Sequence, residues 1–169
     1  GEYVKQLQRH GFQVTGYDGA EGVDVLSKGL VAQLELASRK VQLERKADWG
    51  LLIEVGQLVP RKRLGQLVEN VCDHCAKGLI CTWGTPENPC DGHVSARTPE
   101  EVAKLFAAHG FVRHEKLTRA IYKRIIGRKL RKRMQVFVRK DAKITLNSEV
   151  QAAQQKAAAQ QRGCRGCPR

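Results

Sequence analysis

The chain has 169 residues, of which 41% are hydrophobic, and its formal net charge is +13. This length and apolar content suffice for one globular domain with a sizeable core. We expect neither a membrane span nor a secretory leader, because no apolar run approaches roughly 18 residues and no charged-then-apolar stretch opens the sequence. We interpret the six cysteines as reduced thiols, which predicts a reducing intracellular compartment.

The positive charge is concentrated in one segment. Residues 119–140 contain ten Lys or Arg and no acid, so they account for most of the net charge. A charge run of this kind is often a solvated face, but ten positive charges without an acid favour an acidic partner nearby. We therefore expect RNA or an acidic protein assembly to bind this segment, through Lys123, Arg124, Arg128, Lys129, Arg131, Lys132 and Arg133.

The chain begins with a helix and a strand. Residues 1–7 predict the first turns of a helix, and Gly11 is a typical left-handed helix stop. Residues 12–18 alternate apolar and polar side chains and predict a strand that closes on Asp18. A helix entered from a glycine and then a strand that ends in an acid are typical of the chain directly after the phosphate-binding turn of a dinucleotide-type fold.

The middle of the chain predicts further strands and a helix. We interpret residues 29–36 as a strand, although their Ala, Gln and Leu would also suit a helix, and residues 37–46 are ambiguous. Residues 48–55 are nearly all apolar, which predicts a strand buried on both faces. A helix comes after Pro60, and one of its faces collects Leu64, Leu67, Val68, Val71, Cys72 and Cys75.

A second strand and helix pair comes next. Residues 78–83 predict a buried strand, succeeded by a loop rich in Gly and Pro. Thr98 stands before proline and has Glu three residues later, which is a capping box with proline at the first helical position. This helix is expected to end at Gly110.

The last elements complete an alternating order. Residues 111–117 predict a strand, residues 119–133 a basic helix, and residues 134–139 a final strand. From residue 148 onward Gln and Ala dominate, which predicts a tail outside the core. Alternating strands and helices favour a doubly wound α/β sheet.

This order of elements resembles that of the class I S-adenosylmethionine-dependent methyltransferases, whose sheet is Rossmann-like. Residues 1–4 look like the last glycine of the family's glycine-rich motif and the helix behind it, and residues 16–19 look like the strand that binds the cofactor ribose. The pair Glu35-Leu36 stands where the family often has an acid-hydrophobic pair, and residues 48–60 look like the fourth-strand motif.

The resemblance implies a doubly wound Rossmann-like methyltransferase sheet over residues 1–147, with helices on both faces, and a separate tail over residues 148–169. This sheet would be N-terminally incomplete, because the first strand and most of the glycine-rich motif are absent from the sequence. Gln57 and Leu58 also replace the family's usual Glu-His pair. The implied activity is S-adenosylmethionine-dependent methyl transfer to an unknown acceptor. The alternative is an inactive methyltransferase-fold subunit of a larger assembly.

The resemblance also assigns candidate site residues. Asp18 would accept hydrogen bonds from the ribose hydroxyls of S-adenosylmethionine. Glu35 and Leu36 would contact the adenine, and the backbone of Gly1 would contact the carboxypropyl end. Glu54 closes a buried strand, where open α/β sheets place their ligands. In the loop after the next strand, His93 is the candidate substrate contact, although a loop histidine is more often only solvated.

Two Cys-x-x-Cys pairs raise the question of a metal. Cys72 and Cys75 form one pair and Cys164 and Cys167 the other, and such pairs can bind zinc tetrahedrally. The first pair, however, lies on the apolar face of the predicted helix, where cysteine behaves as a small hydrophobe. We therefore expect no metal.

Overall fold

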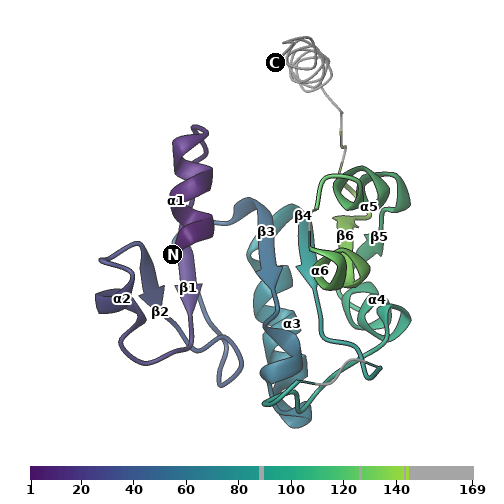
Figure 1. Ribbon diagram of the computed structural model, residues 1–169, viewed down its shortest axis with the longest axis horizontal. Coiled ribbons are helices and arrows are strands. Elements are labelled where there is room, and N and C mark those ends of the chain that lie inside the picture. The colour runs from purple at the N-terminus through teal and green to yellow at the C-terminus, as the bar shows by residue number, and fades with distance from the viewer. Residues whose placement is uncertain (88–89, 126, 143, 145–169) are drawn as a thin grey trace, which may run out of the picture.

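The computed structural model describes residues 1–87, 90–125, 127–142 and 144. Its strands form two sheets, one with the order β1-β2 and one with the order β3-β4-β6-β5. Figure 1 shows the smaller sheet with α1 and α2 on one side of the molecule and the larger sheet with the remaining helices on the other. The predicted tail over residues 148–169 lies outside the described residues.

The smaller unit has the predicted element order. Helix α1 spans Glu2–Arg9, strand β1 Gly16–Asp18, helix α2 Val23–Leu26 and strand β2 Val31–Gln33. Gly11, two residues beyond α1, has φ +82°, a conformation that glycine adopts without a steric penalty. This confirms the predicted left-handed stop.

Both strands of this unit are shorter than the sequence predicts. β1 and β2 pair in parallel from Gly16↔Val31 to Asp18↔Gln33, so residues 12–15 and 34–36 fall outside the ladder. After a last hydrogen bond from Leu34 N to Asp18 O at 2.8 Å, the chain enters a turn in which the Glu35 carboxylate accepts from Ala37 N at 2.8 Å. Alternation alone does not make a strand where no neighbouring strand pairs with it.

The larger sheet is mixed. β3 (Ala47–Ile53) and β4 (Cys75–Thr82) run parallel, whereas β6 (Met134–Arg139) runs antiparallel to β4 and to β5 (Phe111–Arg113). The last strand of the chain therefore lies between two earlier ones. β4 starts three residues earlier than predicted, so Cys75 belongs to the strand and not to the preceding helix.

The prediction that β3 is buried on both faces is wrong. Leu52 is buried against the core, but the neighbouring Leu51 is 43% exposed and Trp49 is 37% exposed. Successive strand side chains point to opposite faces, so one face of β3 is covered and the other is not. Within the described residues β3 also pairs only with β4, which leaves its outer edge open.

The core lies between the larger sheet and two helices, α3 (Leu64–Asp73) and α4 (Pro99–Ala107). The 3₁₀ turns η1 (Gly56–Leu58) and η2 (Arg61–Arg63) lead from β3 into α3. The Thr98 capping box is present in full, with both of its hydrogen bonds formed. The predicted apolar face of α3 is confirmed, since five of its side chains are buried: Leu64, Leu67, Val68, Val71 and Cys72.

The predicted basic helix is two helices. α5 spans Glu115–Tyr122 and α6 spans Arg128–Arg133. α5 starts early and shortens β5, because the His114 side chain accepts the Leu117 N–H at 3.2 Å as an N-cap. Between the helices the Arg131 guanidinium donates to Ile125 O at 2.9 Å, which satisfies a carbonyl at the break.

Three cysteines are part of this core. Burial raises the pKa of Cys72 to about 12 and that of Cys75 to about 11, and it raises the pKa of Cys81 as well. A Cβ built on Gly50 would overlap the Cys75 sulfur, so that strand position requires glycine. The Cys72–Cys75 pair therefore acts as apolar packing, as the sequence indicated.

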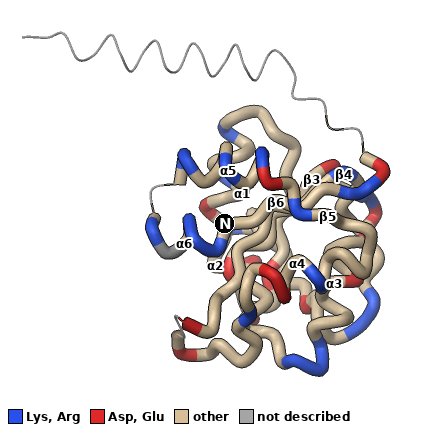
Figure 2. The backbone as a smooth tube through the Cα atoms, turned by 90° about the vertical axis from the view of Figure 1, so that its right-hand side faces the viewer, with Lys and Arg blue, Asp and Glu red and all other residues tan. Residues whose placement is uncertain are grey.

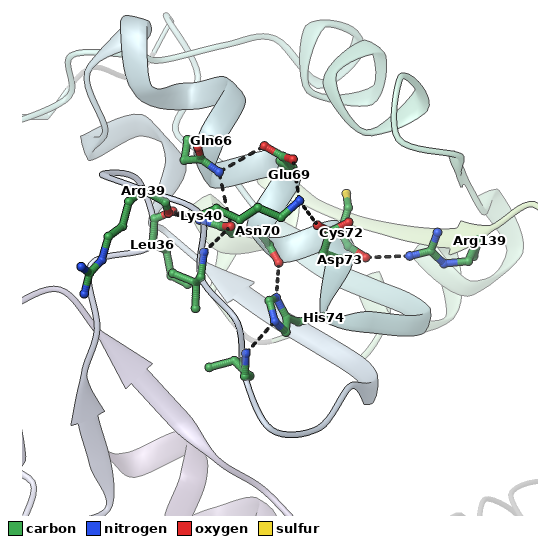
Figure 3. A network of polar contacts seen from close by, with 12 residues as sticks. Leu36, Arg39, Lys40, Gln66, Glu69, Asn70, Cys72, Asp73, His74 and Arg139 are labelled. Atoms are coloured by element: carbon green, nitrogen blue, oxygen red, sulfur yellow. Dashed lines mark hydrogen bonds and ion pairs between the residues drawn. The ribbon is translucent and has the colours of Figure 1, made fainter.

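One polar residue of α3 holds the chain that connects the two sheets (Figure 3). Asn70, 1% exposed, donates to the carbonyls of Leu36 at 2.7 Å and Arg39 at 2.8 Å. Its side-chain oxygen accepts from Val41 N at 3.0 Å. One amide thus satisfies three backbone groups of a segment that has no regular structure of its own.

His74 extends this anchor. Its Nε2 accepts the Leu43 N–H at 3.0 Å, so the ring proton is on Nδ1, which donates to Asn70 O at 2.7 Å. Residues 36–43 are thereby tied to α3 at four backbone positions (Figure 3). We call Asn70 and His74 the α3 clamp.

Replacing Asn70 by alanine leaves the Leu36 and Arg39 carbonyls and the Val41 N–H without partners. We expect Asn70→Ala to lower the free energy of unfolding by about 3 kcal/mol, since each of the three partly buried groups that it orphans costs about 1 kcal/mol. Urea unfolding measures this change, and hydrogen exchange at the Val41 and Leu43 amides should accelerate. Gln42→Ala, at an exposed position of the same segment, is the control. An equal loss in both variants would contradict the clamp.

The raised thiol pKa values predict which of the four cysteines within the described residues is alkylated first. At pH 8 a thiol with a pKa of about 12 has about a thousandfold less thiolate than an ordinary one. Iodoacetamide should modify the exposed Cys90 while Cys72, Cys75 and Cys81 stay unmodified in the folded protein. Peptide mapping by mass spectrometry after a timed quench reads each site separately. Modification of Cys75 as fast as Cys90 would disprove this packing role.

Candidate functional site

Acidic and polar side chains collect where the parallel strands end. Asp18 closes β1, Glu54 comes directly after β3 and Thr82 closes β4. In an open α/β sheet the carboxyl ends of parallel strands are where ligands bind. Two groups of residues form there, one at the end of the smaller sheet and one at the end of the larger sheet.

The first group consists of Asp18 and Glu35. Asp18 Oδ1 accepts the Ala20 N–H at 2.9 Å, which folds the chain back after β1. A Cβ built on Gly19 would lie 3.6 Å from Glu35 Oε2, so the Glu35 carboxylate lies directly beside the residue after Asp18. Both acids are exposed. One oxygen of each carboxylate accepts a hydrogen bond within its own local turn, from Ala20 N to Asp18 and from Ala37 N to Glu35.

Leu36 lies next to this pair and is partly buried against the core. Its carbonyl is held by Asn70 of the α3 clamp. The structure therefore brings together three of the residues that were predicted to bind the cofactor: Asp18, Glu35 and Leu36.

Gly1 does not lie with them. A Cβ built on Gly1 would be 3.3 Å from Leu30 Cβ and 3.4 Å from Ser27 Cβ, which places the start of α1 at the amino end of β2. Asp18 and Glu35 lie at the carboxyl end of the same ladder. Gly1 therefore lies apart from Asp18 and Glu35, because α1 begins at the opposite end of the β1-β2 ladder.

Glu54 is fixed in an unusual backbone conformation. Its φ is +55°, a region that non-glycine residues rarely adopt outside turns and functional sites. The Glu54 N–H donates to Thr82 Oγ1 at 3.0 Å, so the end of β4 holds the turn. This geometry directs the carboxylate toward the start of β6.

Arg133, the last residue of α6, meets Glu54 there. Its Nη1 donates to Glu54 Oε2 at 2.6 Å, and Gln57 Nε2 donates to the same oxygen at 3.1 Å. The Arg133 side chain is 8% exposed and that of Glu54 31%. Removing one member of such a pair would leave the other charge uncompensated in a poorly solvated position. Arg133 was predicted to bind an external partner, whereas the structure buries it in this ion pair.

His93 lies at the same end of the sheet. A Cβ built on Gly84 would overlap the His93 ring, so the loop after β4 requires glycine at this position. The Gln57 carbonyl accepts the Val94 and Ser95 N–H groups, each at 2.9 Å, which ties this loop to η1. The candidate substrate contact thus lies beside the turn that carries Glu54 and Gln57.

Six buried side-chain atoms in the described part of the chain lack a hydrogen-bond partner. All six belong to the segments that meet at this end of the larger sheet: Glu54 Oε1, Gln57 Oε1, His93 Nδ1, Ser95 Oγ, Arg97 Nε and Gln135 Oε1. Buried polar atoms are nearly always paired, so such a concentration requires an explanation. We call these six residues the Glu54 cluster.

The sequence did not single out most of this cluster. Gln57 was noted only as a departure from a motif, and Gln135 stands in what looked like an ordinary final strand. The one available signal was Gln135 itself, which stands among apolar strand residues. It is 4% exposed, and glutamine is uncommon at so buried a position. Arg133 gave no signal, because nothing local distinguishes it from the other basic residues of α6.

The basic segment divides into structural and exposed side chains. Arg131 lies 5.4 Å from the centre of the Tyr122 ring, and Arg139 donates to Cys72 O at 2.6 Å. Figure 2 shows Lys and Arg recurring along α5 and α6. The side chain of Lys129 lies outside those described. The exposed members are Arg119, Lys123, Arg124, Arg128, Lys132 and Lys140.

The described residues offer neither a metal centre nor a membrane span. No group of three or more His, Cys, Asp or Glu side chains is arranged to hold a metal ion there. No helix in this part of the chain is long and apolar enough to cross a membrane. The second Cys-x-x-Cys pair, Cys164 and Cys167, lies outside the described residues.

Comparison with solved structures identifies the fold. The chain is similar to magnesium protoporphyrin IX methyltransferase from Synechocystis PCC 6803 with bound S-adenosylhomocysteine, with a TM-score of 0.52 and 16% identity over 75% of this chain and 64% of that one. It is also similar to a pericyclic reaction enzyme, with a TM-score of 0.50 and 12% identity over 67% of this chain and 35% of that one. No protein-family model matches the sequence, and no curated protein matches it significantly.

These similarities concern architecture. The chain spans less than two thirds of the length of the methyltransferase structure, and identities of 12–16% carry no residue roles. A pericyclic enzyme among the matches also shows that the fold hosts more than one chemistry. The chain therefore has a partial Rossmann-like fold of the class I S-adenosylmethionine-dependent methyltransferase type.

Proposed function

We propose that this chain is part of an S-adenosylmethionine-dependent methyltransferase whose cofactor lies at the carboxyl end of β1 and β2. The observation that supports this most directly is the adjacency of Asp18 and Glu35. Two carboxylates side by side at a strand end offer the acceptor oxygens that a ribose diol needs. Gly19 adds to the fit, because the Glu35 carboxylate occupies the space beside its missing side chain.

In this proposal each residue has a limited role. When bound, the cofactor supplies an electrophilic methyl group, and the protein orients it. Asp18 accepts ribose hydroxyls, and Glu35 accepts from a ribose hydroxyl or the adenine amine. Leu36 provides an apolar contact, and its position is fixed by Asn70. Gly1 takes no part in this site, since it lies at the amino end of the small sheet.

The acceptor side of the proposed enzyme is the Glu54 cluster. It lies at the carboxyl ends of β3 and β4, and the Gln57 carbonyl ties the loop that carries His93 to it. Catalysis in such a site depends mainly on holding the methyl donor and acceptor in line. The strained φ of Glu54 and its two bonds to the ends of β4 and α6 serve that kind of fixed positioning.

Titration of S-adenosylhomocysteine into the longest natural form of the protein tests the cofactor site. We expect binding in the micromolar range, weakened at least tenfold by Asp18→Asn, because that change removes a charged acceptor worth roughly 1.5–3 kcal/mol. Asp24→Asn, in the exposed helix α2, removes the same charge nearby and should leave affinity unchanged. A folded protein that binds no S-adenosylhomocysteine would contradict the proposed enzyme function.

The second candidate is an inactive subunit that binds RNA or an acidic protein through residues 119–140. It is favoured by the six exposed basic side chains of that segment, which carries no acid. Positive side chains that release counterions from a phosphate backbone give affinity that falls steeply with salt. This role is compatible with the methyltransferase fold and does not need a cofactor.

A single-stranded RNA oligonucleotide and poly-glutamate serve as probes for this surface. For RNA, we compare the slope of log Kd against log salt concentration between the wild type and the triple variant Arg124→Gln/Arg128→Gln/Lys132→Gln. The slope should be smaller by about 2 in the variant, because each lost phosphate contact removes about 0.7. The matched control is Arg61→Gln/Lys62→Gln/Arg63→Gln, which removes three exposed charges from η2. Tighter binding of poly-glutamate than RNA indicates an acidic protein partner. An equal change in both variants would refute a localised surface.

A further inference from the structure

The unpaired atoms of the Glu54 cluster differ in whether they can accept or donate a hydrogen bond. Glu54 Oε1, Gln57 Oε1 and Gln135 Oε1 can only accept hydrogen bonds, whereas Arg97 Nε can only donate. His93 Nδ1 and Ser95 Oγ can do either. The cluster therefore has an excess of unsatisfied acceptors, and the group that completes it must bring hydrogen-bond donors.

Separate contacts place these atoms together. Gln57 is bonded to Glu54 through its side chain and to Ser95 through its carbonyl. The Arg97 N–H donates to Gly84 O at 3.0 Å, beside the His93 ring. Gln135 pairs in register with Cys81, the residue before the threonine that holds Glu54. Three segments far apart in sequence therefore converge on one set of acceptors.

The charge of the cluster is already balanced. Glu54 is paired with Arg133 at 2.6 Å, and Arg97 is paired with Glu101 at 3.6 Å. A carboxylate ligand would have to approach the unpaired oxygen of Glu54, where it meets repulsion instead of a hydrogen bond. A neutral group with N–H or O–H donors meets no such cost.

The surroundings add an apolar contact. Leu58 comes after Gln57 and is 52% exposed, and Val94 comes after His93 and is 53% exposed. The Glu54 side chain is 31% exposed, so the cluster lies just below the surface at that residue, although its unpaired atoms are themselves buried. A ligand with a polar head and an apolar body would match both features.

We propose that the Glu54 cluster binds a neutral hydrogen-bond donor, an amide, uncharged amine or hydroxyl, attached to an apolar body, and that it selects against carboxylates. This inference rests on the proposed function in identifying that ligand as the methyl acceptor. The recognition chemistry itself depends only on Glu54, Gln57 and Gln135, and it is testable without the cofactor.

Benzamide and benzoate form a matched pair of probes, since they share a shape and differ in whether the head group donates or carries a charge. In titrations of the ¹⁵N-labelled longest natural form of the protein monitored by NMR, benzamide should shift the Gln57 and Val94 signals. Benzoate should bind at least about tenfold more weakly. Gln57→Leu and, separately, Gln135→Leu should each weaken benzamide binding by about tenfold.

Gln66→Leu is the control, because Gln66 is a half-buried glutamine of α3 whose amide donates to Glu69 at 3.1 Å, outside the cluster. A thermal melt of each variant confirms folding, and two independent glutamine variants keep the test valid if one fails to fold. Equal or tighter binding of benzoate overturns the inference. Binding of neither probe also overturns it and leaves ordered water as the group that satisfies these oxygens.

S-adenosylhomocysteine is titrated into the same samples, which separates this inference from the proposed function. Selective benzamide binding without cofactor binding upholds the donor site and refutes the methyltransferase. Cofactor binding with a preference for benzoate upholds the methyltransferase and refutes the donor site.

Discussion

The arrangement of this molecule depends on the hydrogen bonds that Asn70 makes to a segment without regular structure. The two sheets are not paired with each other within the described residues, so no ladder fixes their relative position. The connection over residues 36–43 is instead fastened to α3 at four backbone groups by Asn70 and His74. Because α3 packs on the larger sheet, this buried amide, together with the packing of Ala37 in the core, sets where Asp18 and Glu35 stand relative to Glu54.

The carboxyl end of the larger sheet contrasts with the core behind it. Phe106 and Phe137 stack at 4.8 Å inside the core, and both are fully buried among apolar side chains. At the strand ends, a buried ion pair, a positive φ and six unpaired polar atoms lie together. Each of these features costs stability. Their concentration in one place is typical of a site whose geometry serves binding, with the apolar core supplying the stability that it gives up.

Arg133 links the two functional candidates physically. It is the last residue of the basic helix α6, yet its guanidinium lies on Glu54 at the candidate acceptor site. A partner bound along α6 would therefore contact the helix that positions Glu54. The fold itself does not fix the chemistry, because the solved structures that share it include a methyltransferase and a pericyclic enzyme.

Features that depend on neighbours within a few turns could be predicted from the amino-acid sequence: the Thr98 cap, the apolar face of α3 and the final strand β6. The Rossmann-like fold was also predicted, and the comparison with solved structures confirmed it. Asp18, Glu35 and Glu54 could be placed near strand ends in the same way, although the exact ends of β1 and β2 depended on which residues pair. Other features emerged only from the folded chain: the exposed face of β3, the break between α5 and α6, the displacement of Gly1 and the bond between Glu54 and Arg133, 79 residues apart. Periodicity and capping are local, whereas burial and pairing depend on which distant segment packs alongside.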